Sequence, residues 1–290
     1  MIRKISDVLK EKERTYSFEF FPPTTEQGEI KLFKAASEFK KLKPDFFSVT
    51  YGAGGGSREK TTRIVDELQR RFDIPAMHHF ACIGHSPAEL KEIINRMRQK
   101  NIYNVLALYG DLPRETILHK PAPDALQYCY QLCEMLRSYG DFFSIGVAGF
   151  PEGHVDLPDK ETDSEYLKIK LDAGGQFVIT QLFFNNRDYF EYLERVRKIG
   201  ITQRIIPGIL PITDYRGLIK FCDNCGATIP KEIHDIFKPL ADDRQATYKA
   251  GVEFALKQCS ALLDGGVPGL HFFTLNKIDP AREILNKLLN

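Results

Sequence analysis

Short runs of β-branched and aromatic residues alternate along the chain with longer segments whose apolar residues recur at helical spacing. Leu90, Ile93, Ile94 and Met97 show the helical pattern, which gives a helix one apolar face for packing on a sheet. Several of the short runs are apolar along nearly their whole length, as in parallel sheets that are covered on both faces. Eight strands are predicted: residues 16–21, 45–51, 76–82, 103–109, 142–150, 176–184, 203–210 and 269–275.

Eight strand–helix units in 290 residues, with no low-complexity linker between them, predict an α/β protein with one closed (βα)₈ TIM barrel. We expect a single domain over residues 1–290, with extra helices at 2–13, at 230–239 before the last strand, and at the C-terminus. The glycines of 172–175 and 264–266 fit helix C-caps. A doubly wound open sheet is the alternative, because a pattern alone does not fix the strand count.

The charge balance argues against polyanionic partners. Forty Lys and Arg face 39 Asp and Glu, which leaves a net charge of +1, and no basic cluster appears. Nucleic-acid binding draws most of its affinity from phosphate neutralisation, so we expect neither a nucleic acid nor an anionic membrane as partner. The apolar runs are far shorter than the roughly 18 residues that suggest a membrane span. The N-terminus lacks the apolar core of a signal peptide, so we expect a cytoplasmic protein.

The cysteines predict reduced thiols. Six cysteines in a chain of this length are sparse and irregularly spaced, unlike a disulfide framework. Cys222 and Cys225 form a CxxC, but no second pair stands at the spacing of a zinc finger. No metal site is therefore predicted.

Glu19 is the first candidate for chemistry, because active sites of (βα)₈ barrels lie at the C-terminal ends of the strands. It lies inside SFEFFPP, where alternation along a strand turns its side chain away from the side of Phe18 and Phe20. Those two rings should face the helices, which puts the carboxyl group in the barrel mouth. Partial desolvation there is expected to raise its pKa and to make it a general acid. A structural, ion-paired glutamate is the alternative.

Other polar residues stand at the same predicted rim. Asp111 follows the fourth strand in LALYGD, where it is either functional or a simple N-cap or Asx turn. Gln181 interrupts the apolar run VITQLFF, so its amide meets either a polar network in the barrel or a ligand such as a heterocyclic ring edge. Lys170, His79 and His154 also lie in or beside rim segments, although a lone histidine is more often structural.

The glycine-rich stretch GAGGGS at 52–57 precedes a predicted helix, an arrangement that can bind phosphate through backbone N–H groups. It matches neither GxGxxG nor the GK[ST] of a P-loop, so it supports neither a Rossmann nor a Walker site. A plain rim loop is the alternative interpretation.

Eight motifs stand in order at the predicted strand ends: SFEFFPP (17–23), SVTYGA (48–53), HFACI (79–83), ALYGDLP (107–113), AGFPEGH (148–154), DAGGQFVITQLFF (172–184), IIPGILPI (205–212) and HFFTLNK (271–277). Together they resemble the successive motifs of the methylenetetrahydrofolate reductases, in the short form that consists of the catalytic domain. The resemblance implies an FAD-containing (βα)₈ barrel that uses NADH or NADPH to convert 5,10-methylenetetrahydrofolate to 5-methyltetrahydrofolate by a ping-pong mechanism. That product supplies methyl groups for methionine synthesis.

The resemblance also implies roles for single residues. Glu19 takes the position of the family's general acid, which protonates the folate as its five-membered ring opens. Asp111 matches a catalytic aspartate near the flavin that contacts the pterin, and Gln181 matches a glutamine that binds folate or nicotinamide. Phe221 corresponds to an aromatic residue that stacks on the substrate, and Lys277 to a basic residue near the folate tail.

Twelve positions correspond to the family's FAD contacts: Thr50, Tyr51, Ala53, His79, Tyr109, Gly110, Asp111, Ala122, Phe150, His154, Asp163 and Lys170. Two of them depart from the family pattern, since Tyr109 stands where many members have Arg and Phe150 where Tyr is common. Tyr166 and Ile169 stand where some members make polar contacts to FAD.

Family members are dimers or tetramers, so a homo-oligomer is expected, and the apolar face of the predicted helix at 279–289 is a candidate for self-association. Two alternatives to the reductase remain. One is a flavin-free pterin-binding barrel of the methyltransferase or pterin synthase type, and the other is a non-catalytic binding module on the same fold.

Overall fold

The structure is a computed structural model that describes the chain except residues 1, 52–57, 111–122, 158 and 290. The described strands form a closed barrel in which all neighbours are parallel and follow chain order. The predicted barrel is confirmed, and the open-sheet alternative is wrong because β1 pairs with β8. The strands are β1 (Thr15–Phe20), β2 (Phe46–Val49), β3 (Ala76–Ala81), β4 (Asn104–Leu108), β5 (Ser144–Gly149), β6 (Phe177–Leu182), β7 (Arg204–Ile209) and β8 (Gly269–Phe273).

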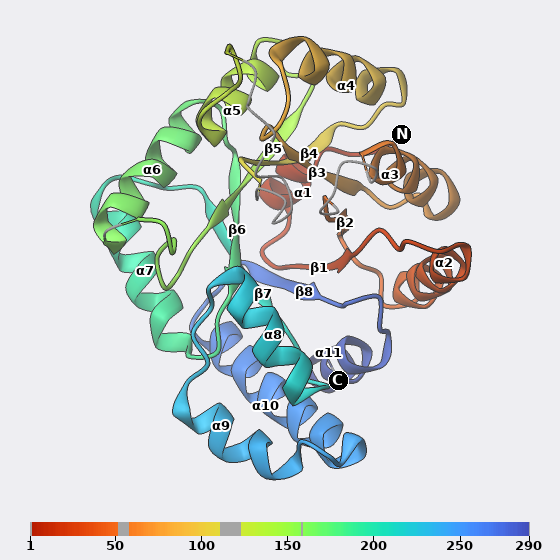
Figure 1. The fold of residues 1–290 in the computed structure, drawn as a ribbon, viewed down its shortest axis with the longest axis vertical. Coiled ribbons are helices and arrows are strands. Elements are labelled where there is room, and N and C mark those ends of the chain that lie inside the picture. Colours follow the sequence, from red (N-terminus) through yellow and green to blue (C-terminus); the bar gives the residue numbers. More distant parts are fainter. Residues whose placement is uncertain (1, 52–57, 111–122, 158, 290) are drawn as a thin grey trace.

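Helices surround the strands on the outside of the barrel (Figure 1). The helices that follow the first six strands are α2 (Glu26–Lys40), α3 (Arg58–Phe72), α4 (Pro87–Gln99), α5 (Cys129–Arg137), α6 (Lys160–Asp172) and α7 (Asn186–Lys198). Four helices lie between β7 and β8: α8 (Tyr215–Cys225), α9 (Lys231–Phe237), the 3₁₀ turn η1 (Lys238–Leu240) and α10 (Arg244–Asp264). The chain also has α1 (Ile5–Glu11) before the barrel and α11 (Asp279–Leu289) after it, so the three predicted extra helices are confirmed.

Alternation along the strands separates two apolar layers. Phe18 and Phe20 face outward as expected, and the Phe18 ring stacks on Phe39 of α2 with 4.1 Å between the ring centroids. The inward-facing residues form a separate core inside the barrel. It consists of Ile5, Leu9, Phe46, Met77, Leu106, Phe177, Ile179 and Ile206.

Helix α1 closes the N-terminal end of the barrel. Its backbone N–H groups at Ile5 and Ser6 donate to Asn104 Oδ1 at 2.7 Å and to Ser144 Oγ at 2.9 Å. Asn104 and Ser144 are the first residues of β4 and β5, so α1 lies against the end at which these strands begin. Because Ile5 and Leu9 complete the interior core, access to the polar residues inside the barrel is left to the C-terminal end.

A second apolar cluster lies beyond the C-terminal ends of β6 and β7. It joins Leu182 and Phe184 to residues of the following loop and of α8 and α9, including Tyr215, Ile233 and Phe237. These helices, with α10, form the lower part of the molecule in Figure 1. The helices between β7 and β8 therefore form a wall beside the barrel mouth.

The outer face of α11 differs from the expectation. Its apolar residues Pro280, Ala281, Ile284 and Leu285 are buried within this chain, and only Leu289 is well exposed. The expected apolar face for self-association on this helix is therefore wrong. Within the described residues, no helix is long and apolar enough to cross a membrane.

Candidate active site

Glu19 lies at the centre of a polar group inside the barrel mouth. Only 3% of the residue is exposed. Its Oε2 atom lies 3.1 Å from Nε2 of His271 on β8 and 3.3 Å from Nε2 of His79 on β3. One carboxyl oxygen thus contacts two imidazoles from strands on either side of β1.

Two serines hold the imidazoles in place. Ser17 Oγ lies 2.7 Å from Nδ1 of His271, and Ser48 Oγ lies 2.6 Å from Nε2 of His79. The register explains this, because Ser17 is paired with His271 and Glu19 is paired with Ser48 across the neighbouring strands. The parallel ladder therefore places all five side chains, which we call the Glu19 group, on the inner face of four consecutive strands, β8, β1, β2 and β3.

The two imidazoles decide the charge of Glu19. Burial raises its pKa, but the charge of a protonated His79 and hydrogen bonds from His271 and His79 together outweigh burial. They lower the pKa of Glu19 from 4.5 to about 2. The expected rise in its pKa is wrong, because that expectation counted desolvation and not the two partners. Near neutral pH Glu19 is therefore a carboxylate.

Sequence reasoning missed three members of the Glu19 group. His271, Ser17 and Ser48 were not singled out, although each is a polar residue at an inward position of an apolar strand, which is the signal that identified Glu19. The alternation could have flagged them individually. It could not have shown that they meet, because that depends on strand order and register.

Thr50 and Tyr51 follow β2 at the same rim. The backbone N–H of Thr50 donates to Phe20 O at 2.9 Å, which holds this segment to β1. Thr50 is buried, and its Oγ1 has no hydrogen-bond partner among the described residues. The Tyr51 hydroxyl lies 3.2 Å from Nε2 of His85.

Gly110 allows the backbone turn that follows β4. Gly110 has a φ of +95°, and a Cβ there would lie 2.7 Å from Ile83 Cγ2 and 2.8 Å from Ala81 Cβ. Only glycine fits this close passage, whereas Tyr109 beside it is 39% exposed. The predicted site residues Ala53, Asp111 and Ala122, and the stretch 52–57, lie outside the described residues.

Four predicted residues gather where β5 leads into α6. The Phe150 and His154 rings form an edge contact with centroids 4.7 Å apart, and Lys170 Nζ lies 5.7 Å from the Phe150 centroid. Lys170 Nζ also donates to Ala148 O at 2.7 Å. Asp163 is buried, which raises its pKa despite Lys170 and His154 nearby, and its Oδ2 has no partner among the described residues.

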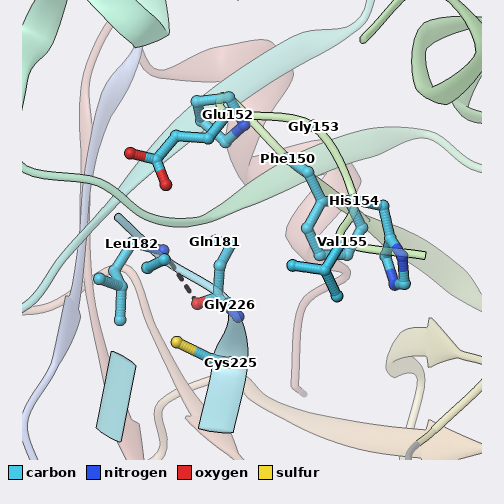
Figure 2. Close-up of a pocket in the computed structure, with 11 residues that line it drawn as sticks. Phe150, Glu152, Gly153, His154, Val155, Gln181, Leu182, Cys225 and Gly226 are labelled. Atoms are coloured by element: carbon cyan, nitrogen blue, oxygen red, sulfur yellow. Dashed lines mark hydrogen bonds between the residues drawn. The ribbon is translucent and has the colours of Figure 1, made fainter. Parts of the chain in front are cut away.

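Gln181 lies away from the Glu19 group and lines a small side pocket with Phe150, His154 and Cys225 (Figure 2). Its Oε1 accepts a hydrogen bond from the backbone N–H of Leu182 at 2.9 Å. The pocket encloses about 30 Å³, far below the several hundred Å³ of a typical cofactor site. It is therefore a niche beside the mouth and too small for a flavin.

The remaining two predicted substrate residues lie on the wall formed after β7 and on the loop after β8. Phe221 of α8 packs against the second apolar cluster. Lys277 Nζ donates to Thr213 Oγ1 at 2.9 Å, so the side chain bridges the two loops. Among the residues that the structure describes, no group of three or more His, Cys, Asp or Glu could hold a metal ion.

Fold and site together define a (βα)₈ barrel with a buried carboxylate–imidazole group at its C-terminal mouth. The profile of the methylenetetrahydrofolate reductase family matches residues 4–289. The chain is 36% identical over 272 residues to 5,10-methylenetetrahydrofolate reductase of Escherichia coli strain K12, covering 94% of this chain and 90% of that protein. With the same enzyme of Buchnera aphidicola subsp. Schizaphis graminum it shares 37% identity over 279 residues, covering 96% and 93%. The chain belongs to the methylenetetrahydrofolate reductase family.

Some relatives are longer. Methylenetetrahydrofolate reductase (NADH) 1 of Arabidopsis thaliana is 33% identical over 298 residues, which cover 99% of this chain and 50% of the plant protein. The chain thus spans about half the length of the plant relative. Among solved structures, a Clostridium thermocellum protein that binds two copies of 5-methyl-5,6,7,8-tetrahydrofolic acid superposes with a TM-score of 0.66 at 14% identity, covering 97% of both chains. At that identity the likeness shows the shared fold.

Proposed function

We propose that this chain reduces 5,10-methylenetetrahydrofolate to 5-methyltetrahydrofolate, with FAD as bound cofactor and NADH or NADPH as reductant. Family membership over residues 4–289 supports the reaction. The observation that carries the proposal is the buried carboxylate of Glu19 between His79 and His271, at the open end of the barrel. Buried charged groups at strand ends of this fold are typical of catalytic sites.

Unpartnered buried atoms at the rim fit a large polar cofactor. Buried polar atoms are nearly always hydrogen-bonded in proteins, yet Thr50 Oγ1 and Asp163 Oδ2 lack a partner among the described residues. Both belong to the positions that match the family's FAD contacts. The described residues that would hold FAD are Thr50, Tyr51, His79, Tyr109, Gly110, Phe150, His154, Asp163 and Lys170. When bound, FAD supplies hydride transfer between the reductant and the folate.

The Glu19 group would supply a proton to the folate. Opening the five-membered ring requires protonation of the departing nitrogen, and the Glu19 group joins a carboxyl to two imidazoles that can carry a proton. Oε2 of Glu19 contacts Nε2 of both His79 and His271, so it can pass a proton from either ring to a nitrogen of a folate bound at the barrel mouth. Glu19 would thus donate the proton to the folate directly, and the two histidines would supply that proton to Glu19.

Binding of the folate would use the wall beside the mouth. Phe221 lies on this wall and would stack on the ring system, and Lys277 on the loop after β8 would pair with the acidic tail. Gln181 would bind the ring edge from the adjoining niche, and Asp111 would contact the pterin. Because α1 closes the other end of the barrel, nicotinamide and folate would enter by the same mouth, which supports a ping-pong order.

Glu19→Gln tests the assignment, with the two half-reactions followed separately by stopped-flow absorbance of the flavin. We expect the reductant half-reaction to stay within about threefold of wild type, because no proton donor is needed there. The folate half-reaction is expected to slow by about 100-fold or more, the usual contribution of a positioned proton donor. A folate half-reaction of unchanged rate would contradict the role of Glu19.

Ser17→Ala is the matched control, because it keeps Glu19 and removes only the hydroxyl beside Nδ1 of His271. We expect it to slow the folate step by less than about tenfold, since the proton path stays intact.

The visible spectrum of the purified protein after addition of FAD tests the cofactor. A colourless protein that still binds folate would favour the flavin-free pterin-binding barrel. The homo-oligomer stays a prediction, to be measured by light scattering.

A further inference from the structure

The proposed function leaves the CxxC pair of α8 without a role. Cys222 is 2% exposed and belongs to the second apolar cluster, whereas Cys225 is partly buried and lines the niche with Gln181 and Glu152 (Figure 2). Both thiols are free. Residues three apart lie on one face of a helix, and the two side chains are hydrogen-bonded to each other.

The environment makes the two thiols unequal. The hydrogen bond with Cys222 lowers the pKa of Cys225 to about 7, with help from the backbone N–H of Ala227 and against burial and Glu152. The same hydrogen bond and burial raise the pKa of Cys222 well above its usual range. A helix C-terminus disfavours an anion, so these local hydrogen bonds act against the helix dipole. One accessible thiolate beside one buried thiol is the arrangement of an attacking and a resolving cysteine.

The end of α8 leaves room for a disulfide. Cβ atoms three apart in a regular helix are about 5–6 Å apart, and a disulfide needs about 3.8 Å, so the last turn must tighten. Cys225 is the last residue of α8, and Gly226 follows it with a φ of +73°. The backbone N–H of this glycine donates to Cys222 O at 2.8 Å. A terminal turn that ends in glycine can adjust in a way that a turn inside a helix cannot.

We propose that Cys225 and Cys222 form a thiol–disulfide exchange site that reduces small disulfides carrying amino groups. The thiolate of Cys225 attacks one sulfur of the disulfide, which forms a mixed disulfide and releases one thiol. Cys222 then loses its proton to water and attacks Sγ of Cys225, which releases the second thiol. Two cysteine thiols are oxidised to one internal disulfide, and the small disulfide is reduced to two thiols.

Charge around the pair selects the amino group. The charged groups that act on the two thiols or on Glu152 comprise the acidic Glu152, Asp188 and Asp223 and one basic residue, Lys160. His154 also lines the niche. A positively charged disulfide therefore fits the surroundings of Cys225 better than an anionic one.

The test uses the reduced full-length chain and two probes of similar length and opposite charge, cystamine and 3,3′-dithiodipropionate. Intact mass and peptide mapping after a short incubation report the products, and neither flavin nor folate is needed. A failure of this test is thus distinct from a failure of the proposed reductase. With cystamine, we expect the protein to lose two hydrogens and to carry a Cys222–Cys225 disulfide. With the anionic probe, we expect a rate about tenfold lower.

Variants assign the two sulfurs. Cys222→Ser is expected to stop at a mixed disulfide on Cys225, and Cys222→Ala serves if serine at this buried position prevents folding. Cys225→Ser is expected to react at least about tenfold more slowly. Cys129→Ser, in the separate thiol pair of α5, is the control and should react like wild type. A wild-type protein that keeps the mixed disulfide, wild-type reactivity in Cys225→Ser, or equal rates with both probes would overturn the proposal.

Discussion

Glu19 is fully enclosed by the barrel, yet it is held as a carboxylate because His79 and His271 contact the same oxygen. The alternation around Phe18 and Phe20 predicted where the side chain points, since that depends only on the strand itself. Its charge could not be predicted in the same way. His271 lies 252 residues further along the chain, and only the closed barrel brings it to Glu19.

Acid is expected to weaken the fold through this residue. The folded pKa of Glu19 is about 2 and its ordinary value is 4.5, so the carboxylate stabilises the fold above pH 4.5. This contribution is lost as the pH falls from about 4.5 through 2. In Glu19→Gln it is absent, so wild type should exceed the variant by roughly 3 kcal/mol in unfolding free energy at pH 5. Urea unfolding at pH 5 and pH 2.5 measures the gap, and a gap that stays constant would contradict the prediction.

At the scale of elements, the pattern predicted all eight strands and the extra helices, but not their ends. The apolar run 176–184 continues past β6, which ends at Leu182, because Phe183 and Phe184 are buried outside the ladder. Apolar pattern reports burial, and burial extends beyond the hydrogen-bonded strand. The same limit applies to α11, whose apolar stripe predicts a packed face without saying that this chain itself covers it.

The docking of helix α1 against the barrel is expected to depend on one side chain of β4, that of Asn104. Asn104 accepts from Ile5 N through Oδ1 at 2.7 Å and donates to Arg3 O through Nδ2 at 3.1 Å. Asn104→Ala leaves a buried N–H unpaired, so we expect a loss of about 2–3 kcal/mol in unfolding free energy and faster amide exchange in α1. Ser144→Ala, which removes the single bond to Ser6 N, should cost about half as much. Equal losses, or unchanged exchange in α1, would argue against this docking role.

At the scale of the whole molecule, the barrel is closed by the contact of its first and last strands. Gly269 passes so close to β1 that a Cβ there would lie 2.0 Å from Thr15 O. Beyond the ladder, Asn276 Oδ1 accepts from Phe21 N at 2.9 Å and its Nδ2 donates to Phe21 O at 2.8 Å. Thr274 Oγ1 donates to Glu19 O at 2.6 Å, so the same seam supports the candidate site.

Asn276 contributes to the stability of the fold through its side-chain hydrogen bonds and through its backbone conformation, and variants can separate the two. Its φ is +59°, a conformation that asparagine and glycine tolerate better than alanine. Asn276→Gly keeps the backbone conformation and loses both side-chain bonds, for which we expect a loss of about 2 kcal/mol. Asn276→Ala should cost about 1 kcal/mol more, because it adds the backbone penalty. Urea unfolding measures both losses, and equal losses in the two variants would show that the positive φ adds no penalty for alanine.

The closed seam also fixes when the candidate site can exist during synthesis. Thr15 to Phe20 leave the ribosome early, and α2 follows at once to cover the outward phenylalanines with Phe39. Their edge partner β8 arrives more than 250 residues later, as the bond between Asn276 and Phe21 spans 255 positions. At about 5–20 residues per second, the first strand waits roughly 10–50 s for its neighbour. Until then Glu19 has no His271 beside it, so a nascent chain that stalls before β8 carries the carboxyl group without one of the two partners that set its charge.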